Sequence, residues 1–397
     1  MRISDQELNR LRVLKAIRRL GPIARTHLAG TTGLAGGTIT ELTSDLLRRQ
    51  IVIEEKSPSS GRGRPRVELR INPEAGYVVG AWLTNSGRLV IEIINLTGEQ
   101  IYSTTRQLVT SANLSALVEQ TAQLIDDCII ASGLSKSTIH CIGAILPGLL
   151  NSEQGLVLWV PTYATEPVAA ADIIRRQTSL PTVIDNRANV LARAEHWFGS
   201  GERLDDFILF NIDLSIGYAQ YAAGELVQNS RGMEPAIAHI KMDSRQGPLC
   251  FCGDRGCLAS YCTPPGIISR ICTLRQQPIP ALKDMQTAFA GFIDDAKAGD
   301  SAVNAVFAEA GLMLGTTIGN FINLYNPARV EVVIANPELA DIMTPTMLDA
   351  ITQATLSLLR GKVPVSIRIA EKNNYWRGAA ALGLEQIYKA SGQLPPP

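Results

Sequence analysis

The sequence lacks the features of a membrane-spanning or secreted protein. No apolar run reaches the roughly 20 residues that a membrane-spanning helix needs. The first 20 residues are charged and amphipathic, and they lack the apolar core and cleavage site of a secretory signal. Cysteine is scarce, and its count of seven is odd, which does not suit a full set of disulfides. These absences predict a cytoplasmic protein without a membrane partner.

The sequence also lacks net charge, with 37 Lys and Arg against 37 Asp and Glu, but the charges are unevenly placed. Residues 1–70 contain 14 basic and 7 acidic residues, which leaves 23 basic and 30 acidic residues for the remainder. A basic head on an acidic body indicates a nucleic-acid-binding module attached to a part with another role. At 397 residues the chain is too long for one small core, so two or three domains are expected.

Residues 1–72 are predicted to form a winged helix-turn-helix domain. Apolar residues recur at three-residue steps in a first helix, namely Leu8, Leu11, Leu14, Ile17 and Leu20. Gly21 and Pro22 end this helix, and two further helices are expected over residues 25–31 and 36–49. Apolar and polar residues alternate at 51–55 and 67–71, which predicts the two strands of a wing. Three helices followed by a hairpin are typical of a domain that binds double-stranded DNA.

The third helix would enter the major groove, and the wing loop would enter the minor groove. The candidate residues for base contacts are Gly37, Thr38, Thr40, Glu41 and Ser44, and those for phosphates are Arg48 and Arg49. Arg62 and Arg64 of the Gly-Arg-Gly-Arg-Pro loop suit a narrow A·T-rich minor groove. The alternative for this loop is a disordered basic segment. Ala35 stands where Ser or Thr would cap the third helix better, and two glycines weaken its first turn.

A histidine and three cysteines have the spacing of a metal site. Cys250, Cys252 and Cys257 lie in a Cys-x-Cys-Gly-x-x-Gly-Cys turn, and His239 precedes them by eleven residues. Glycines allow such a turn to bring three sulfurs toward one point. A Cys3His set forms a closed tetrahedral Zn²⁺ shell without a position for water, which predicts a structural ion. The alternative is a group of buried or disulfide-bonded cysteines. Cys262 is a substitute ligand, and the others, Cys128, Cys141 and Cys272, are expected in the core.

From residue 76 onward, predicted strands and helices alternate, which favours an α/β body of two lobes. Strands are expected at 77–83, 88–95, 99–107, 139–146, 182–184, 206–223, 330–335 and 365–369. Helices are expected at 114–132, 188–198, 264–274, 285–298, 301–325, 337–359 and 375–389.

These motifs resemble those of the ROK family, named for repressors, open reading frames and sugar kinases. The zinc motif is the most specific similarity, and the segments 143–148, 314–334 and 377–383 also resemble those of the family. The resemblance covers nearly the whole length of the chain. The resemblance implies an actin-like (ribonuclease-H-like) ATPase fold, with a first lobe at 73–187 plus 378–397. The second lobe, 188–377, would hold the zinc site and an oligomerisation surface. Family members with a winged helix are transcriptional regulators. From the resemblance and from the usual symmetry of soluble oligomers, a homodimer or homotetramer is expected.

Three positions depart from the pattern that the resemblance implies for the family's kinases. Trp82 replaces the Asp of the first phosphate loop, and Asp213 lies in the second, where it would repel a phosphate. Arg187 occupies the position of the catalytic base, and a guanidinium does not accept a proton. Sugar kinase activity is therefore not expected, and a kinase with an accessory DNA-binding head is the alternative.

The resemblance also implies a changed effector site. Two family glutamates that bind sugar hydroxyls are Ala236 and Ala259 here, whereas Asn186 and His239 persist. We expect an anionic, sugar-derived effector, and the candidate ligand-binding residues are Gly148, Asn186, Arg187 and His239. The alternative is that Arg187 forms an internal ion pair with Glu234 or Asp185.

The predicted function is a repressor of carbohydrate metabolism genes that binds double-stranded DNA under the control of this effector. A third interpretation is a body that only dimerises and is regulated by a partner protein.

Overall fold

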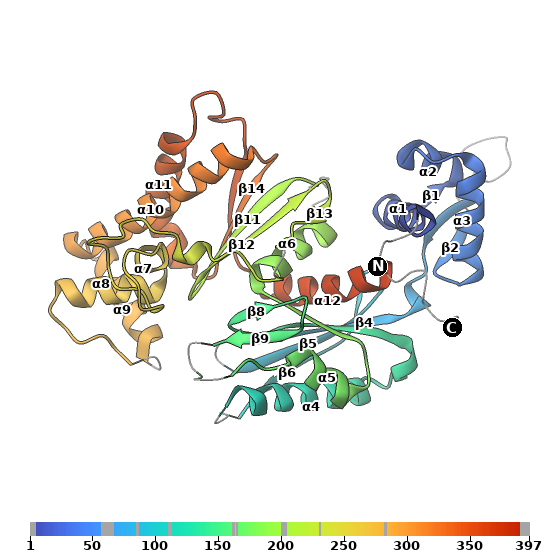
Figure 1. Ribbon diagram of the computed structural model, residues 1–397, viewed down its shortest axis with the longest axis horizontal. Helices are drawn as coiled ribbons and strands as arrows, with labels where there is room; N and C mark the ends of the chain where they lie inside the picture. The colour runs from blue at the N-terminus through green and yellow to red at the C-terminus, as the bar shows by residue number, and fades with distance from the viewer. Residues whose placement is uncertain are drawn as a thin grey trace. The chain divides into compact units, whose positions relative to one another are not determined.

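A computed structural model describes residues 5–56, 67–84, 87–109, 113–160, 163, 166–199, 205–229, 232–281 and 284–389 (Figure 1). The chain forms two compact units, of which the first is Met1–Asn186 together with Tyr375–Pro397. The second unit is Arg187–Asn374. The chain therefore leaves the first unit after Asn186 and returns to it at Tyr375.

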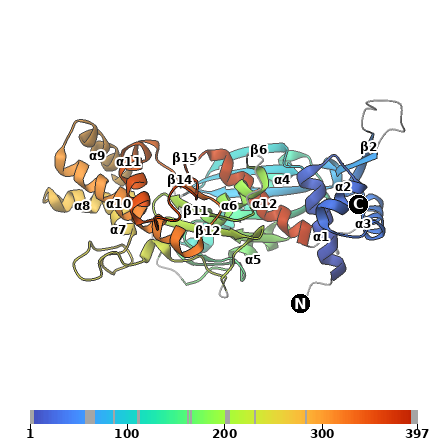
Figure 2. The same ribbon diagram turned by 90° about the horizontal axis from the view of Figure 1, so that it is seen from above.

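The N-terminal head combines three helices with a three-stranded antiparallel sheet. Its elements are α1 (Asp5–Leu20), β1 (Ile23–Ala24), α2 (Arg25–Thr32), α3 (Gly36–Arg48), β2 (Val52–Lys56) and β3 (Val67–Ile71). The strand order is β1-β3-β2, and Figure 2 shows the helices grouped together. Leu14 and Ile17 of α1, Leu28 of α2, Leu46 of α3 and Leu69 of β3 are almost fully buried. The apolar stripe of the sequence therefore supplies one shared core.

The rest of the first unit is a five-stranded mixed sheet between helices. Its elements are η1 (Pro73–Ala75), β4 (Tyr77–Leu83), β5 (Arg88–Asn95), β6 (Gln100–Gln107), α4 (Leu114–Ser132), η2 (Lys136–Thr138), β7 (Ile139–Ile145), β8 (Leu149–Asn151), β9 (Leu156–Trp159), α5 (Ala170–Thr178), β10 (Thr182–Asp185) and α12 (Lys372–Lys389). The order is β10-β7-β4-β5-β6. Helices α4 and α5 pack with every second residue of β4 and β5, and α12 crosses the opposite face (Figure 1). Gly80 permits that crossing, because a Cβ there would lie 2.9 Å from Trp376 O.

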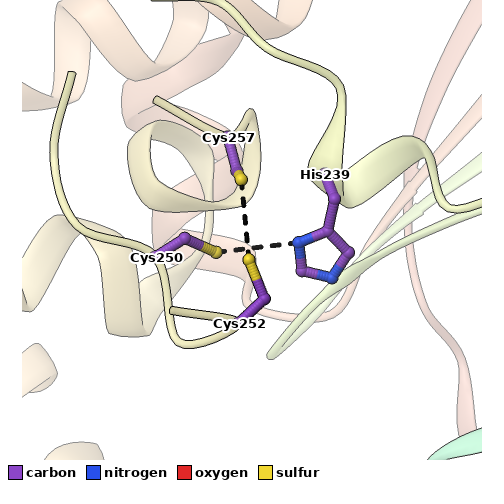
Figure 3. Close-up of side chains that lie close together, drawn as sticks. All are labelled: His239, Cys250, Cys252 and Cys257. Atoms are coloured by element: carbon purple, nitrogen blue, oxygen red, sulfur yellow. Dashed lines mark hydrogen bonds between the residues drawn. The ribbon is translucent and has the colours of Figure 1, made fainter. Parts of the chain in front are cut away.

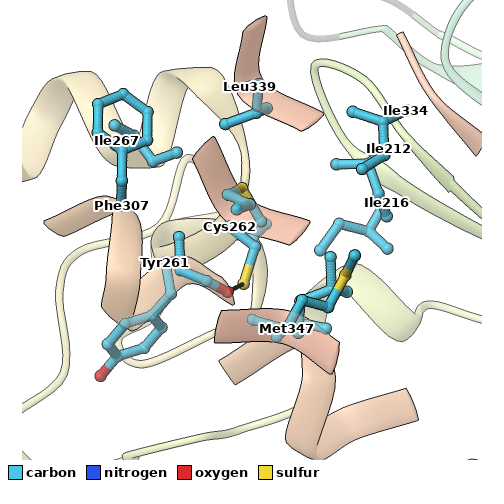
Figure 4. Packing of buried hydrophobic residues seen from close by; sticks show 14 of the residues in the cluster. Ile212, Ile216, Tyr261, Cys262, Ile267, Phe307, Ile334, Leu339 and Met347 are labelled. Carbon is cyan, nitrogen blue, oxygen red and sulfur yellow. Dashed lines mark hydrogen bonds between the residues drawn. The ribbon is translucent and has the colours of Figure 1, made fainter. Parts of the chain in front are cut away.

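The second unit is built on another five-stranded sheet, of order β13-β12-β11-β14-β15. Its elements are α6 (Arg187–Phe198), β11 (Phe207–Ile212), β12 (Ile216–Ala222), β13 (Glu225–Leu226), η3 (Ile237–His239), α7 (Ala259–Cys262), α8 (Pro264–Leu274), α9 (Met285–Lys297), α10 (Ser301–Tyr325), β14 (Val330–Ile334), α11 (Pro337–Ala354) and β15 (Val365–Ile369). A continuous apolar core joins this sheet to α7, α8, α10 and α11, with Ile212, Cys262, Phe307 and Met347 among its members (Figure 4).

Helix α10 is the central helix of this core. Asp300 caps its start by accepting from the backbone N–H groups of Ala302 and Val303, at 3.0 and 3.1 Å. Asn326 ends it in the left-handed conformation, with φ of 42°. By length and composition α10 could cross a membrane, but 56% of its most apolar window is buried inside the unit. This burial is typical of the core helix of a globular unit.

Most predicted elements are present, and the differences have local causes. The β8–β9 hairpin and α5 were not predicted, and α11 ends at Ala354, whereas its predicted end is residue 359. The Asn323 side chain stops α11, because its amide donates to Ala354 O and its oxygen accepts from Leu356 N–H. These bonds replace the next helical turn.

Candidate metal centre and nucleic-acid interface

Four side chains of the second unit converge on one point (Figure 3). His239 ends η3, Cys250 and Cys252 lie in the following turn, and Cys257 precedes α7. Their ligand atoms all lie within 4.8 Å of one another. His239 Nδ1 lies 3.7 Å from Cys250 Sγ, and Cys252 Sγ lies 3.7 Å from Cys257 Sγ.

The separations fit a tetrahedral ion. Zn–S bonds of about 2.3 Å and Zn–N bonds of about 2.0–2.1 Å place neighbouring ligand atoms about 3.5–3.8 Å apart in a tetrahedron. The two 3.7 Å separations match this range. Three soft sulfur donors and one imidazole nitrogen are also the ligand types that Zn²⁺ prefers.

Backbone pairing in the turn holds the cysteines together. Cys250 N–H donates to Asp254 O at 2.7 Å, and Gly253 N–H donates to Cys250 O at 3.0 Å. Gly253 and Gly256 have φ of 93° and 68°, a region that favours glycine. At Gly256 a Cβ would also collide with the Asp243 backbone. The glycines of the motif are therefore required by the shape of the turn.

The protonation behaviour of the cluster reflects its burial. Burial raises the pKa of Cys250 to about 12. Burial also acts to raise the pKa of Cys252, but hydrogen bonds from the Asp254 backbone and the neighbouring thiols lower it overall. The pKa of His239 is lowered by burial and by the Lys241 charge, which favours the neutral imidazole that binds metals.

The remaining cysteines lie elsewhere, and all seven are free thiols. The expectation that Cys262 could substitute as a ligand is wrong, because its Sγ donates to Ala310 O at 3.2 Å within the apolar core. Cys128, Cys141 and Cys272 are buried core residues, as expected. Cys262 follows Cys257 closely in the sequence, but helix α7 turns it toward α10.

Helix α3 presents one polar face to solvent. Its buried residues are Ile39, Leu42, Thr43 and Leu46. The candidate base-contacting residues lie outside this buried stripe, with Gly37, Thr40, Glu41 and Ser44 exposed and Thr38 half-buried. Within the described residues, the helix begins after Ala35 without a side-chain cap, and Gly36 and Gly37 border open space. Its first backbone N–H groups therefore have no capping side chain to compete with a ligand.

The two arginines at the end of α3 have different environments. Arg48 is 75% exposed, and Arg49 is only 16% exposed. Both lie near the Asp45 carboxylate, at 3.5 and 3.8 Å. Burial lowers the pKa of Arg49, whose guanidinium belongs to the interior of the head. The structure thus places Arg48 better than Arg49 for contact with a phosphate.

A partly exposed contact that the sequence did not predict joins α2, α3 and the hairpin. Arg25 Nε donates to Thr43 Oγ1 at 3.0 Å, and its terminal nitrogen donates to Glu54 Oε1 at 2.9 Å. The residues are far apart in the sequence, so no spacing pattern could reveal this contact. Arg62 and Arg64 lie outside the described residues.

Two of the positions that depart from the kinase pattern face each other in the second unit. Arg187 begins α6 and forms an ion pair with Asp213, which follows β11. The side chains are 16% and 27% exposed. An internal ion pair of Arg187 is one of the two alternatives that the sequence leaves open, although the sequence suggests Glu234 or Asp185 as the partner and not Asp213. Asp185, one of the partners considered, accepts from Ser152 Oγ at 2.8 Å and from Asn186 N–H at 2.7 Å in the first unit.

The remaining candidate positions are distributed over both units. Trp82 of the first unit stacks on Tyr375, with ring centroids 4.3 Å apart. Gly148 has φ of 105°, and a Cβ there would collide with Trp159 O. Gly148 and Asn186 belong to the first unit, whereas Arg187 and His239 belong to the second, where His239 is part of the metal cluster.

The fold and the cluster define an α/β protein with two five-stranded sheets, a three-helix head and a Cys3His group of metal-binding type. The chain belongs to the ROK family, whose model matches residues 87–390. The fold is the actin-like α/β fold of that family, as the sequence indicated.

Repressors are among the relatives. A xylose repressor from Caldicellulosiruptor bescii is 27% identical over 335 residues and covers 82% of each chain. The DNA-binding transcriptional repressor Mlc from Escherichia coli is 24% identical over 96% of this chain and 93% of its own. The crystal structure of a ROK family transcriptional regulator, a homologue of the E. coli Mlc protein, has a TM-score of 0.79, with 26% identity and 97% coverage of both chains.

Proposed function

We propose that this chain is a DNA-binding transcriptional repressor of carbohydrate metabolism genes. The observation that carries the proposal is the exposed polar face of α3 in a head that follows the order of a winged helix-turn-helix. The similarity to a ROK transcriptional regulator over 97% of both chains, head included, supports it. Arg48 would contact a phosphate, and the base-contacting residues of α3 would be Gly37, Thr38, Thr40, Glu41 and Ser44. Arg62 and Arg64 remain the candidates for the minor groove.

The metal proposal is a structural Zn²⁺ held by His239, Cys250, Cys252 and Cys257. The donor types and the two 3.7 Å separations support it. When bound, the ion would fix the segment between η3 and α7, which otherwise has little regular secondary structure. Four protein ligands leave no position for a substrate, so the ion's role would be structural.

The effector is proposed to be a small, sugar-derived molecule, and the xylose repressor among the relatives supports a sugar. The candidate effector-binding residues are Gly148, Asn186, Arg187 and His239. The Asp213 carboxylate already pairs with Arg187, so an anionic effector would compete with it for the guanidinium. Effector binding would shift the equilibrium between DNA-binding and released states.

We also propose that the chain is not a kinase, although the family contains sugar kinases. The ion pair places a carboxylate at the second phosphate loop and a cation at the position of the base. At the loop position a carboxylate would repel a phosphate, and at the base position a guanidinium does not accept a proton from a hydroxyl.

The proposed assembly is a cytoplasmic homodimer or homotetramer. A symmetric pair of heads would read a palindromic or A·T-rich site with half-sites about 34–36 Å apart, or a multiple of that distance.

Selection of genomic DNA fragments by the purified full chain tests the proposal. The selected fragments should bind with an affinity that falls steeply as salt rises, and Arg48→Gln should weaken binding and reduce the salt slope by about 1 per contacted phosphate. Lys297→Gln is the matched control, because Lys297 pairs with Glu338 on the second unit, and it should leave both quantities unchanged.

Two results would contradict the proposal. One is the absence of any salt-sensitive preference among duplexes, and the other is steady ATP turnover with a sugar acceptor, which would favour the kinase alternative. Titration of small metabolites against DNA affinity distinguishes effector control from control by a partner protein.

A further inference from the structure

A lysine lies against the metal cluster and is not one of its four ligands. Lys241 follows His239 by two residues, and its Nζ donates to Cys257 Sγ at 3.2 Å. The same ammonium donates to Asp254 Oδ2 at 3.1 Å and to Arg255 O at 3.2 Å. An ammonium has three donors, so these contacts use its full capacity.

The backbone brings this lysine to the sulfur by direct pairing. Lys241 and Cys257 form an antiparallel bridge, Met242 N–H donates to Gly256 O at 2.7 Å, and Leu258 N–H donates to Ile240 O at 2.9 Å. The segment after His239 is thereby paired with the segment around the last cysteine. The Lys241 side chain adds a second connection between the same two segments.

The charges of the cluster give the contact a chemical meaning. Three thiolates and a neutral imidazole around a divalent ion leave one net negative charge, which the ammonium balances. Cys257 is fully buried, so its sulfur has no access to solvent, and the ammonium is a charged donor at hydrogen-bond distance. A hydrogen bond from a cationic donor to a metal-bound thiolate is stronger than one between neutral groups.

We propose that Lys241 is a positioning residue of the metal site, which balances the charge of the Cys257 thiolate and raises the affinity for Zn²⁺. The proposal rests on the zinc site proposed above. Outer contacts of this kind typically change metal affinity by about 10–100-fold. Asp254 is the competing partner of the ammonium, since it lies 3.1 Å from Nζ and is largely exposed.

The test is zinc competition between the full chain and a chromophoric chelator. Lys241→Met should raise the Kd for Zn²⁺ by about 10–100-fold. In the Co²⁺-substituted protein, its thiolate-to-metal absorption band should shift, because the sulfur loses its charged donor. Lys241→Arg, which keeps the charge, should retain more of the affinity than Lys241→Met.

Two controls isolate the sulfur contact. Lys297→Met removes the same charge from an ion pair with Glu338 and should not change the Kd. Asp254→Asn removes the competing carboxylate while its backbone carbonyl still accepts from Cys250 N–H, and it should not weaken zinc binding. If Lys241→Met does not fold, Lys241→Gln replaces it in the same measurement.

The outcomes separate the two proposals. A wild-type chain that binds no Zn²⁺ overturns the metal site itself. A wild-type chain that binds Zn²⁺ while Lys241→Met binds with the same Kd and the same Co²⁺ spectrum overturns only the role of Lys241. An equal loss in Asp254→Asn also overturns that role, because the ion pair, and not the sulfur contact, would then account for the effect.

Discussion

At the scale of single residues, two departures from an enzyme's residue pattern compensate each other. Asp213 alone would place an uncompensated carboxylate beside the β11–β12 turn, and Arg187 alone would place a cation at the start of α6. Together they form a partly buried ion pair. The sequence revealed each change because each lies in a recognisable motif. The pairing itself joins residues distant in the chain, and no local pattern could have predicted it.

Glu92 gives a prediction at the same scale. It is 5% exposed on β5, and its Oε1 accepts from Ser103 Oγ at 2.6 Å. Its Oε2 has no hydrogen-bond partner among the residues that the structure describes. Burial raises the pKa of this carboxyl, and the Ser103 bond offsets only part of that rise. The folded state therefore holds a proton at pH values where the unfolded chain has released it, so stability decreases as pH rises from about 4.5 through the raised pKa.

Glu92→Gln should remove this pH dependence and raise the free energy of unfolding at neutral pH by about 1 kcal/mol, since no charge is then buried. Urea unfolding of both chains from pH 4.5 to neutral pH measures the difference. Glu119→Gln on the exposed face of α4 should follow the wild type at every pH. A constant difference between Glu92→Gln and the wild type across this range would show that ionisation of Glu92 has no effect.

At the scale of elements, the sequence predicted best where a helix carries its own boundary residues. The bounds of α4 and α10 agree with the prediction at both ends, and Asn113 and Asp300 cap their first turns. The β8–β9 hairpin was missed because its strands are only three and four residues long. The convergence of His239 and the three cysteines was predictable because these residues lie close together in the chain. The burial of Arg49 depends on the neighbouring helices and was not predictable.

The contact between α10 and α11 provides an element-scale prediction. Gly311, Gly315 and Gly319 form a stripe on α10 where a Cβ would meet α11. At Gly315 it would collide with Met347 O and lie 2.7 Å from Ala350 Cβ. Gly315→Ala should therefore lower the free energy of unfolding by about 1–3 kcal/mol, because the helices must separate.

Gly291→Ala is the matched control, because Gly291 is exposed on α9 and no atom of the described part of the chain lies within 4 Å of its added Cβ. It should raise stability by up to about 1 kcal/mol through helix propensity. Thermal unfolding of the two variants compares them directly. Equal stability of Gly315→Ala and the wild type would mean that the two helices are not closely packed.

At the scale of the whole molecule, we expect the metal cluster to influence DNA binding. The cluster lies in the second unit, in which we also place the oligomerisation surface. Removing the ion should loosen the segment between η3 and α7 and weaken the joint binding of two heads. Avidity from two linked heads often exceeds a single interaction by about 10²–10⁴-fold, so even partial loss should be measurable.

Replacement of Cys250 and Cys252 by Ala should therefore weaken binding to selected DNA by about tenfold or more. Fluorescence anisotropy with the full chain measures the affinity. Chelation of the wild type should have the same effect, and added Zn²⁺ should restore binding to the wild type but not to the variant. Unchanged affinity in both cases would separate the metal from DNA binding.

The path of the chain has a consequence for its synthesis. The sheet of the first unit is complete by β10, but the helix that covers its second face is α12, the last element of the described residues. On the ribosome, that face must stay uncovered while the whole second unit is translated and begins to fold. Premature termination anywhere before α12 should therefore yield a product that chaperones and proteases recognise, however well its head is formed.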